Sequence, residues 1–323
     1  MTICRTAARL LLALAALSTA GQSWAQNYPV RSIRVLHGFA AGGPPDTVLR
    51  QVAARLEKSL GQPVIVENRP GASGTLAAAA VARAEPDGYL LLFGVAANLA
   101  VAPATMKAVP YDPVTSFTPI VEVARGPYVW LVRADAPART MPEFIAWSRS
   151  QPGRLNYGSP GIGSVHHLAT EGLKQATGID IVHVPFGGRL YTALLGGQID
   201  AMFESMPGPA PHLASGKLRA LAVTGAHRLA VLPDVPTLAE QGIRGLEVNS
   251  WWGFVGPAGL PPAVVTRLNA AVHQALAEPE LRAAFDKMTI VPSPDTSAAF
   301  AAYIAAEASR WKDAVARVGL KPE

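Results

Sequence analysis

The sequence is nearly devoid of cysteine. Its 323 residues contain only Cys4, so a disulfide framework is excluded and the compartment has to be inferred from other signals. Charged residues make up only 16% of the chain and form no run of Lys or Arg, which argues against a nucleic-acid partner despite the net charge of +5. Beyond the N-terminus, no apolar stretch reaches membrane-spanning length without Gly, Pro or charge.

The N-terminal residues are typical of a cleaved secretory signal. Arg5 and Arg9 precede a short apolar run of Leu and Ala at residues 10–17, and Ser23-Trp24-Ala25 offers the small residues that signal peptidase reads. Cleavage would remove residues 1–25 and leave 323 − 25 = 298 residues, enough for two domains. We therefore expect an exported protein. An uncleaved membrane anchor is the less favoured alternative.

A glycine-rich turn at residues 39–47 is the first candidate binding element. It lies between an apolar run at 33–36, predicted to be a buried strand, and an amphipathic helix that ends at Gly61. The first N–H groups of a helix have no internal partner, and Gly42-Gly43 lets a ligand approach the backbone. Asp46 lies in the first helical turn, where it either stabilises the helix dipole or anchors a bridging water.

A second glycine-rich turn, residues 156–164, opens another predicted helix. Ser164 is a favourable N-cap and Gly178 ends the helix. The adjacent His166 and His167 would point about 100° apart, a poor geometry for one metal ion. We expect no metal, one histidine on the surface and His167 beside the ligand loop. Both turns are expected to receive an anion.

Strand and helix signals alternate along most of the chain, which predicts an α/β architecture. Further strands are predicted at residues 64–67, 89–93, 129–132, 181–184, 201–203, 218–224 and 250–255. Helical patterns cover 75–84 and 191–195, begin after Thr140 and Pro261, and recur near the C-terminus. Residues 94–98 are expected to form a loop after a strand, at the sheet edge where ligands of open α/β sheets bind.

Short motifs in a fixed order give the chain a resemblance to a known family. They are Phe39-Ala40-Ala41-Gly42-Gly43 with Asp46, Gly61-Gln62-Pro63-Val64, Glu67-Asn68-Arg69-Pro70-Gly71, Pro86-Asp87-Gly88-Tyr89, Tyr111-Asp112-Pro113, Tyr157-Gly158-Ser159 with Gly161, Gly163-Ser164 and His167, His183-Val184-Pro185, Gly196-Gly197-Gln198, Leu232-Pro233-Asp234-Val235-Pro236-Thr237, and Trp251 with Gly253 and Pro257-Ala258-Gly259. Together they resemble the Bug family, the periplasmic solute-binding receptors of tripartite tricarboxylate transporters.

The resemblance implies a two-lobed periplasmic-binding-protein fold of class II, the Venus-flytrap type. Residues 26–124 plus 239–323 would form lobe 1 and residues 125–238 lobe 2, with crossings near residues 125 and 238. The resemblance also implies a small organic carboxylate as ligand, one large and one small integral membrane subunit as partners, and no cofactor. The protein would be a monomer located in the periplasm.

Family residues carried over to this chain define two ends of a ligand site. The ligand carboxylate would lie between the two turns, near Phe39, Ala40, Gly43 and Asp46 on one lobe and Ser159, Gly161, Gly163, Ser164 and His167 on the other. The far end of the ligand would meet Ala96, Ala97, Asn98, Pro185, Phe186, Phe203, Glu204 and Ser205.

Three departures from the family pattern concern the far end and the approach to it. His37-Gly38 replaces an apolar residue and proline, Phe186-Gly187 stands where Tyr-Lys is common, and Glu204 stands where Asp is common. Glu204 could also face solvent. The identity of the ligand is therefore the feature that transfers least from the resemblance.

Two other function classes are left open. An exported hydrolase or isomerase would have Ser159 or Ser164 with His167 as its catalytic pair, although position 157 is Tyr where a nucleophile elbow needs Gly. We expect no catalytic residue. A sensory binding protein without a transport role would share every motif. Trp251 and Trp252 are expected to serve packing, because neighbours on a strand alternate between its faces.

Overall fold

The computed structural model describes residues 28–186, 190–206 and 208–321. The expected signal at residues 1–25 and the departure at Gly187 lie outside them. Within the described residues, no helix combines the length and apolarity that a membrane crossing requires.

The first lobe is built on a sheet in which β1 (Ile33–His37) lies next to the edge strand. β1 pairs in parallel with β2 (Val64–Asn68) and with β3 (Leu90–Val95). β3 pairs antiparallel with β9 (Asn249–Pro257), so a strand from late in the chain extends the sheet. Both ends of the described chain therefore contribute to this lobe.

Helices pack on both faces of this sheet. They are α2 (Pro44–Leu60), α3 (Thr75–Ala82), α4 (Ala102–Thr105), α9 (Pro262–Ala277), α10 (Pro279–Lys287) and α11 (Ser297–Arg317). Val35 lies in the core formed with α2, α9 and α10, whereas the next residue, Leu36, lies in the core that includes α3 and α11. This alternation is what a strand buried on both faces requires.

The second lobe has its own sheet. β5 (Asn156–Ser159) pairs in parallel with β6 (Val182–Pro185) and β7 (Ala201–Ser205), while β4 (Phe117–Arg133) pairs antiparallel with β7 and β8 (Leu218–Val223). Its helices are α5 (Met141–Ser150), α6 (Val165–Thr177), α7 (Leu190–Leu195) and α8 (Ala210–Ala214).

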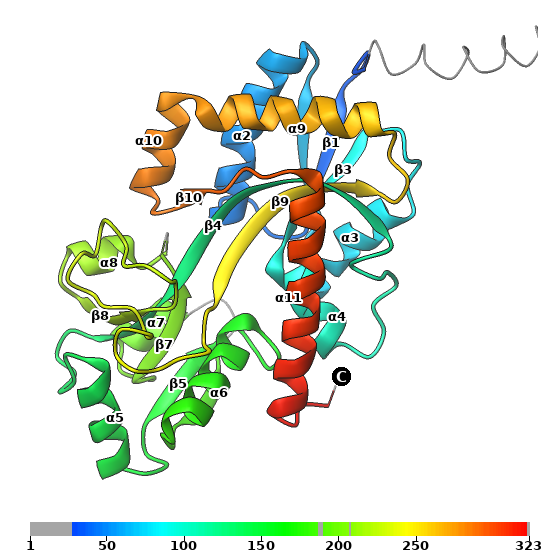
Figure 1. Cartoon of the computed structure of the whole chain (residues 1–323). Coiled ribbons are helices and arrows are strands. Elements are labelled where there is room, and N and C mark those ends of the chain that lie inside the picture. Colours follow the sequence, from blue (N-terminus) through cyan, green and yellow to red (C-terminus); the bar gives the residue numbers. More distant parts are fainter. Residues whose placement is uncertain (1–27, 187–189, 207, 322–323) are drawn as a thin grey trace, which may run out of the picture.

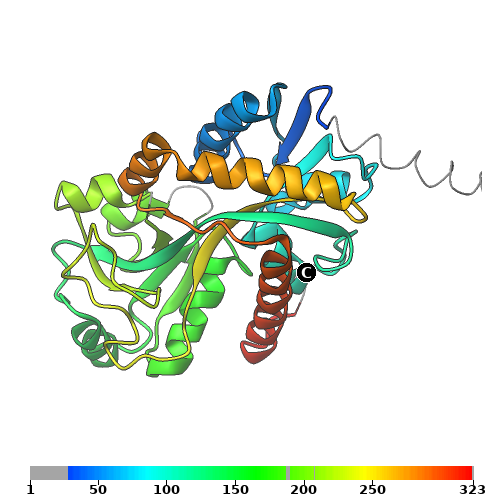
Figure 2. The ribbon, with the colours of Figure 1, turned by 45° about the horizontal axis from the view of Figure 1, so that its top comes forward.

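Two long strands join the lobes. β4 pairs with β9 through residues 117–127 and, in its second half, with β7 and β8 through residues 128–133. Figures 1 and 2 show β4 and β9 running together from one lobe to the other. Between them, Thr224 Oγ1 accepts from the Tyr128 N–H (2.8 Å) and donates to the Val248 carbonyl (2.5 Å). The two crossing segments are thus tied to each other by one buried hydroxyl group.

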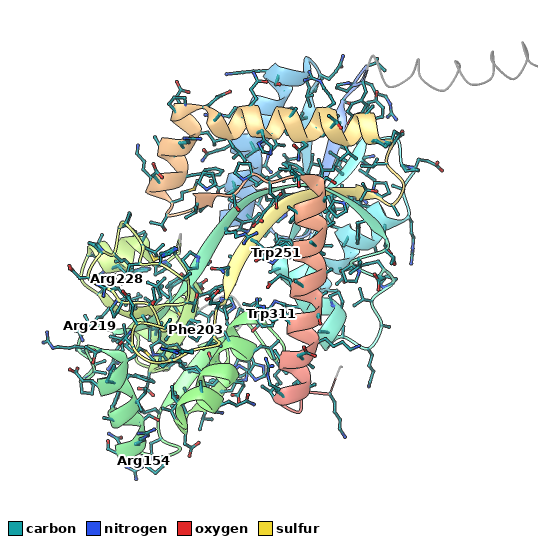
Figure 3. All side chains as sticks on the ribbon, in the orientation of Figure 1. Arg154, Phe203, Arg219, Arg228, Trp251 and Trp311 are labelled. Carbon is teal, nitrogen blue, oxygen red and sulfur yellow. The ribbon has the colours of Figure 1, made fainter. Side chains whose placement is uncertain are left out.

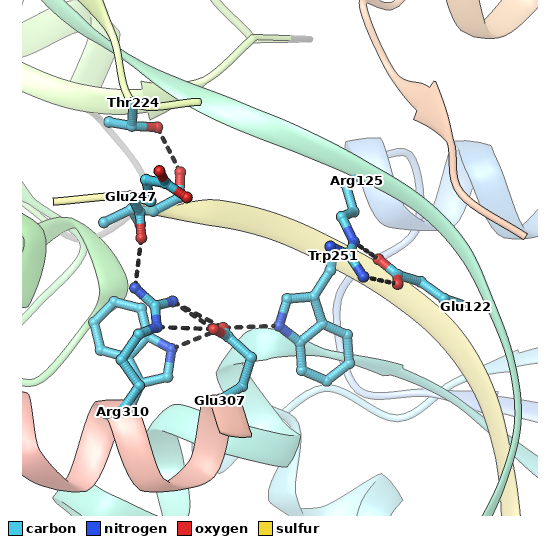
Figure 4. Close-up of polar contacts among 9 residues, drawn as sticks. Glu122, Arg125, Thr224, Glu247, Trp251, Glu307 and Arg310 are labelled. Carbon is cyan, nitrogen blue, oxygen red and sulfur yellow. Dashed lines mark hydrogen bonds and ion pairs between the residues drawn. The ribbon is translucent and has the colours of Figure 1, made fainter. Parts of the chain in front are cut away.

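Helix α11 braces the same crossing from the side. Trp251 of β9 and Trp311 of α11 lie between these two elements (Figure 3), and both indole N–H groups donate to Glu307 at 3.2 Å. Arg310 pairs with Glu307 and also donates to the Glu247 carbonyl (2.5 Å), just before β9 (Figure 4). The C-terminal helix therefore fixes the position of the chain where it returns to the first lobe.

The sheet and helix predictions are largely confirmed, with two differences. β4 starts at Phe117, twelve residues before the predicted strand at 129–132, in a segment that Pro119, Gly126 and Pro127 interrupt in the sequence. Residues 94–98 are not a loop: Val95 still belongs to β3, and Ala97–Val101 is a wide helical turn that continues into α4. Asn98 stabilises this join, because its Oδ1 accepts from the Val95 N–H at 2.9 Å.

Candidate functional site

A cavity of about 560 Å³ lies between the lobes. The first lobe lines it with apolar side chains, among them Phe39, Ala96, Met106 and Trp252. The second lobe contributes the turn before α6 and polar side chains at the end of β7. The lobes also touch here, since a Cβ added at Gly163, whose φ is +73°, would lie 3.0 Å from Cβ of Thr105 in α4. Glycine is therefore needed at this position both for its backbone conformation and for its small size.

The turn before α6 and the first turn of this helix present N–H groups beside the cavity that have no partner in the described part of the chain. The N–H groups of Gly161, Gly163, Ser164 and His167 are all bonded within the turn. None of the described residues accepts from the N–H groups of Ile162, Val165 and His166. The first turn of α6 also contains no acidic residue. Free donors at the positive end of a helix dipole make this turn a suitable site for an anion.

The first glycine-rich loop is held together by Asp46. Its carboxylate accepts from the Gly42 N–H (2.9 Å), from Arg50 Nε (2.9 Å) and from Asn68 Nδ2 (2.8 Å). Asn68 also donates to the Phe39 carbonyl at 3.0 Å. Burial alone would raise the pKa of Asp46, but these hydrogen bonds hold it at about 2, so the group is ionised. The contribution of Arg50 and Asn68 was missed from the sequence because they lie outside the turn.

The two turns therefore differ in what they can offer an anion. Pro44 and Pro45 begin α2 and have no N–H group, and the carboxylate of Asp46 already lies in the first turn of that helix. Phe39 and Pro45 are the members of this loop that line the cavity. The first loop thus supplies an apolar wall, whereas the turn before α6 supplies donors.

Stacked rings support the second turn from behind. The His167 ring lies 4.2 Å from the His183 ring, which stacks on Tyr157 at 4.9 Å. His167 Nδ1 accepts from the Gly163 N–H (3.1 Å), and Ser159 Oγ lies 2.6 Å from His183 Nε2. Ser159, His167 and His183 are not among the residues that line the cavity. Their contacts instead hold the turn in place.

We expect acid to destabilise the fold through this stack. Burial and then the neighbouring His167 lower the pKa of His183 to about 4, so the native state keeps the ring neutral. The stability that the neutral His183 ring contributes to the fold is complete above pH 6.5 and is lost as the pH falls toward 4. Between pH 7 and pH 5, wild type should lose about 2 kcal/mol more unfolding free energy than a His183→Asn variant, measured by urea denaturation. Equal losses in the two proteins would contradict this assignment.

A cluster of polar side chains beside the start of α6 is centred on Glu204. Its Oε1 accepts from the Ser205 N–H (2.8 Å) and lies 3.4 Å from His166 Nε2. The ring of Tyr128 packs edge-on against His166. His166, expected at the surface, therefore lines the cavity, and its side chain is only 15% exposed. The reason is the position of α6: residue 166 faces the cavity from the first turn, while residue 167 turns back toward the sheet.

The structure brings some of the predicted ligand residues to the cavity and places others behind it. Those that line it are Phe39, Ala96, Gly161, Gly163, Ser164 and Glu204. Those outside the lining are Ala40, Gly43, Asp46, Asn98, Ser159, His167, Pro185, Phe186 and Phe203. Ala97 and Ser205, also expected at the far end of the ligand, line the cavity as well. The lining residues that the sequence did not suggest include Tyr128, His166, Ser250 and Lys321. Of the two expected packing tryptophans, Trp252 reaches the cavity and Trp251 is fully buried.

Comparisons with known proteins agree on one family. Residues 48–320 match the sequence model described as "Tripartite tricarboxylate transporter family receptor". The chain is 34% identical over 327 residues to Protein BugT of Bordetella pertussis, which covers 99% of each chain. Two solved structures from Rhodopseudomonas palustris are similar: MatC with bound malate (37% identity, TM-score 0.78, 89% of this chain and 100% of that one) and a protein with adipate (32%, 0.83, 92% and 100%). The chain belongs to the tripartite tricarboxylate transporter receptor family, which includes the Bug proteins.

Proposed function

We propose that this protein is a non-enzymatic receptor that captures a small organic carboxylate between its lobes for a tripartite transporter. The observation that carries the proposal is a set of N–H groups with no acceptor among the described residues, those of Ile162 in the turn before α6 and of Val165 and His166 at its start, all beside the cavity. A carboxylate bound there would accept several main-chain hydrogen bonds at the positive end of a helix dipole. The malate and adipate in the two related structures support this ligand class.

The remaining cavity walls suit this role. Apolar groups from Phe39, Ala96 and Trp252 would exclude water from the bound carboxylate, which strengthens each hydrogen bond. The Asp46 cluster would keep the first loop in the shape that places Phe39 opposite α6. Of the predicted contacts, Ala40, Gly43 and Asp46 would then act by supporting the loop.

The lobe boundaries, partners and location are part of the proposal. We place one crossing near residue 125, and the bond from Thr224 to Val248 favours a return crossing close to residue 249 rather than 238. Ligand binding would close the lobes about these two strands. The loaded receptor would meet one large and one small membrane subunit in the periplasm, as a monomer released from its signal at residue 25.

The contacts of Ser159 favour a receptor over a hydrolase. Ser159 is fully buried, and its hydroxyl group lies within hydrogen-bond distance of His183 and of both the N–H and the carbonyl of Gly161. Ser164 Oγ donates to the Gly161 carbonyl at 2.7 Å and caps α6. Both hydroxyl groups therefore shape the turn. These contacts do not support Ser159 or Ser164 as a nucleophile with His167 as its base.

A binding panel tests this function. Residues 26–323 would be screened by thermal shift against monocarboxylates, dicarboxylates, tricarboxylates and amino acids, and calorimetry would follow each hit. We expect a 1:1 complex with at least one carboxylate, a raised melting temperature and unchanged ligand after prolonged incubation. Catalytic conversion of a carboxylate, or binding confined to compounds without a carboxylate group, would refute the proposal.

A further inference from the structure

Glu204 is a buried carboxylate that has no Lys or Arg partner among the described residues. Its side chain is 16% exposed, and His166 is the basic group beside it. Every hydrogen bond that Glu204 accepts within the described chain goes to Oε1, from the N–H and hydroxyl groups of Ser205 and from His166. No hydrogen bond within the described chain goes to Oε2, so this atom can accept from a molecule in the cavity that Glu204 lines, in competition with the nearby Tyr191 hydroxyl group.

Resting on the proposed function, we propose that the ligand carries a hydrogen-bond donor, a hydroxyl or ammonium group, close to its carboxylate, and that Glu204 recognises this donor. A donor on the ligand would satisfy Oε2, which a second carboxylate cannot do. A hydrogen bond to an ionised group changes affinity by roughly tenfold to a hundredfold, enough to dominate the choice between related acids.

The charge state of Glu204 supports this assignment. Burial would raise the pKa of Glu204, but His166 and the Ser205 hydrogen bonds lower it below its ordinary value, so the group is an anion. After burial, the negative charge of Glu204 is the next cause that raises the pKa of the Tyr128 and Tyr191 hydroxyl groups. Two neutral tyrosine hydroxyl groups therefore lie near the carboxylate, and a second ligand carboxylate would be repelled by the negative charge of Glu204.

The position of His166 limits the distance between the two ligand groups. Its main-chain N–H belongs to the proposed carboxylate site, while its ring contacts Glu204 at 3.4 Å. One residue thus spans both subsites, which favours donors on the second or third carbon of the acid. Lys321 also lines the cavity, but it is exposed, so its charge is screened by solvent.

A matched ligand series tests this inference. Calorimetry would compare pentanoate with its variants bearing a hydroxyl, ammonium or second carboxylate group on the second or third carbon. Wild type should bind at least one hydroxyl or ammonium compound about tenfold or more tightly than both pentanoate and the matching diacid, as expected for a donor to a charged group. The relative affinities of the hydroxyl and ammonium compounds distinguish the two donors.

Variants of the two charged lining residues sharpen the test. Glu204→Gln should reduce the advantage of the ammonium compound over the diacid to about threefold or less, whereas Lys321→Met should retain the wild-type order. The inference is overturned if wild type binds the diacid more tightly, a result that does not depend on the folding of a variant. It is also overturned if Glu204→Gln leaves the ratio of the affinities for the ammonium compound and the diacid unchanged. Tight binding of acids without any preference for a donor would reject this inference alone, whereas failure of every acid in the wider panel would reject the proposed function.

Discussion

Replacing Ser164 with aspartate is expected to weaken carboxylate binding at least about 100-fold while leaving the protein folded. Ser164 lines the cavity and caps α6, with its side chain accepting from the His167 N–H. Aspartate is an equally good N-cap, so the helix should still form. Its added charge would lie next to the bound carboxylate, where two like charges 4 Å apart repel by about 4 kcal/mol at an effective dielectric constant of 20.

The matched control is Ser164→Asn, which keeps the cap without adding charge. Calorimetry should show an affinity within a few-fold of wild type for asparagine and a severe loss for aspartate, and thermal melts should show both variants folded. Both variants lack the hydroxyl group that donates to the Gly161 carbonyl at 2.7 Å, and they differ from each other chiefly by the negative charge of aspartate. Wild-type affinity in Ser164→Asp would mean that the carboxylate binds away from α6.

Glu307→Leu is expected to cause the largest loss of stability, about 3 kcal/mol of unfolding free energy. Glu307 is only 5% exposed and accepts from two indole N–H groups and from Arg310. Removing the carboxylate leaves the indole N–H groups of Trp251 and Trp311 without an acceptor and removes the ion-pair partner of Arg310. The contact between α11 and the returning strand shown in Figure 4 would then be lost.

Urea denaturation at neutral pH measures this loss. The control is Asp135→Asn, which breaks the ion pair between Asp135 and Arg133. These side chains are 75% and 38% exposed, so the loss of the pair should cost less than about 1 kcal/mol of unfolding free energy. A loss in Glu307→Leu no larger than in the control would show that the network of α11 does not support the crossing strands.

Features encoded locally could be predicted from the sequence. Gly61 and Gly178 end α2 and α6 in the left-handed conformation, and Ser164 caps α6, because each of these structures depends on a few neighbouring residues. The glycine-rich turns were found for the same reason. The apolar patterns on either side of these turns also indicated correctly that a strand precedes each turn and a helix follows it.

Features that depend on distant residues could not be predicted in the same way. Asp46 at the start of α2 was expected to contact the ligand. Its hydrogen-bond partner Asn68 comes from β2 and directs the carboxylate into the loop. The inward direction of His166 depends on how α6 is placed on its sheet. The length of β4 depends on β9, which pairs with it across more than a hundred residues of sequence. No local pattern contains these relations.

The most direct test of the central claim is an NMR titration of the ¹⁵N-labelled protein with the tightest carboxylate from the binding panel. The account predicts that the backbone amide signals of Ile162, Val165 and His166 move most, because their unpaired N–H groups gain an acceptor. It also predicts small changes at Gly42, whose N–H is already bonded to Asp46. Saturable binding that leaves the amide signals of Ile162, Val165 and His166 unmoved would contradict this assignment.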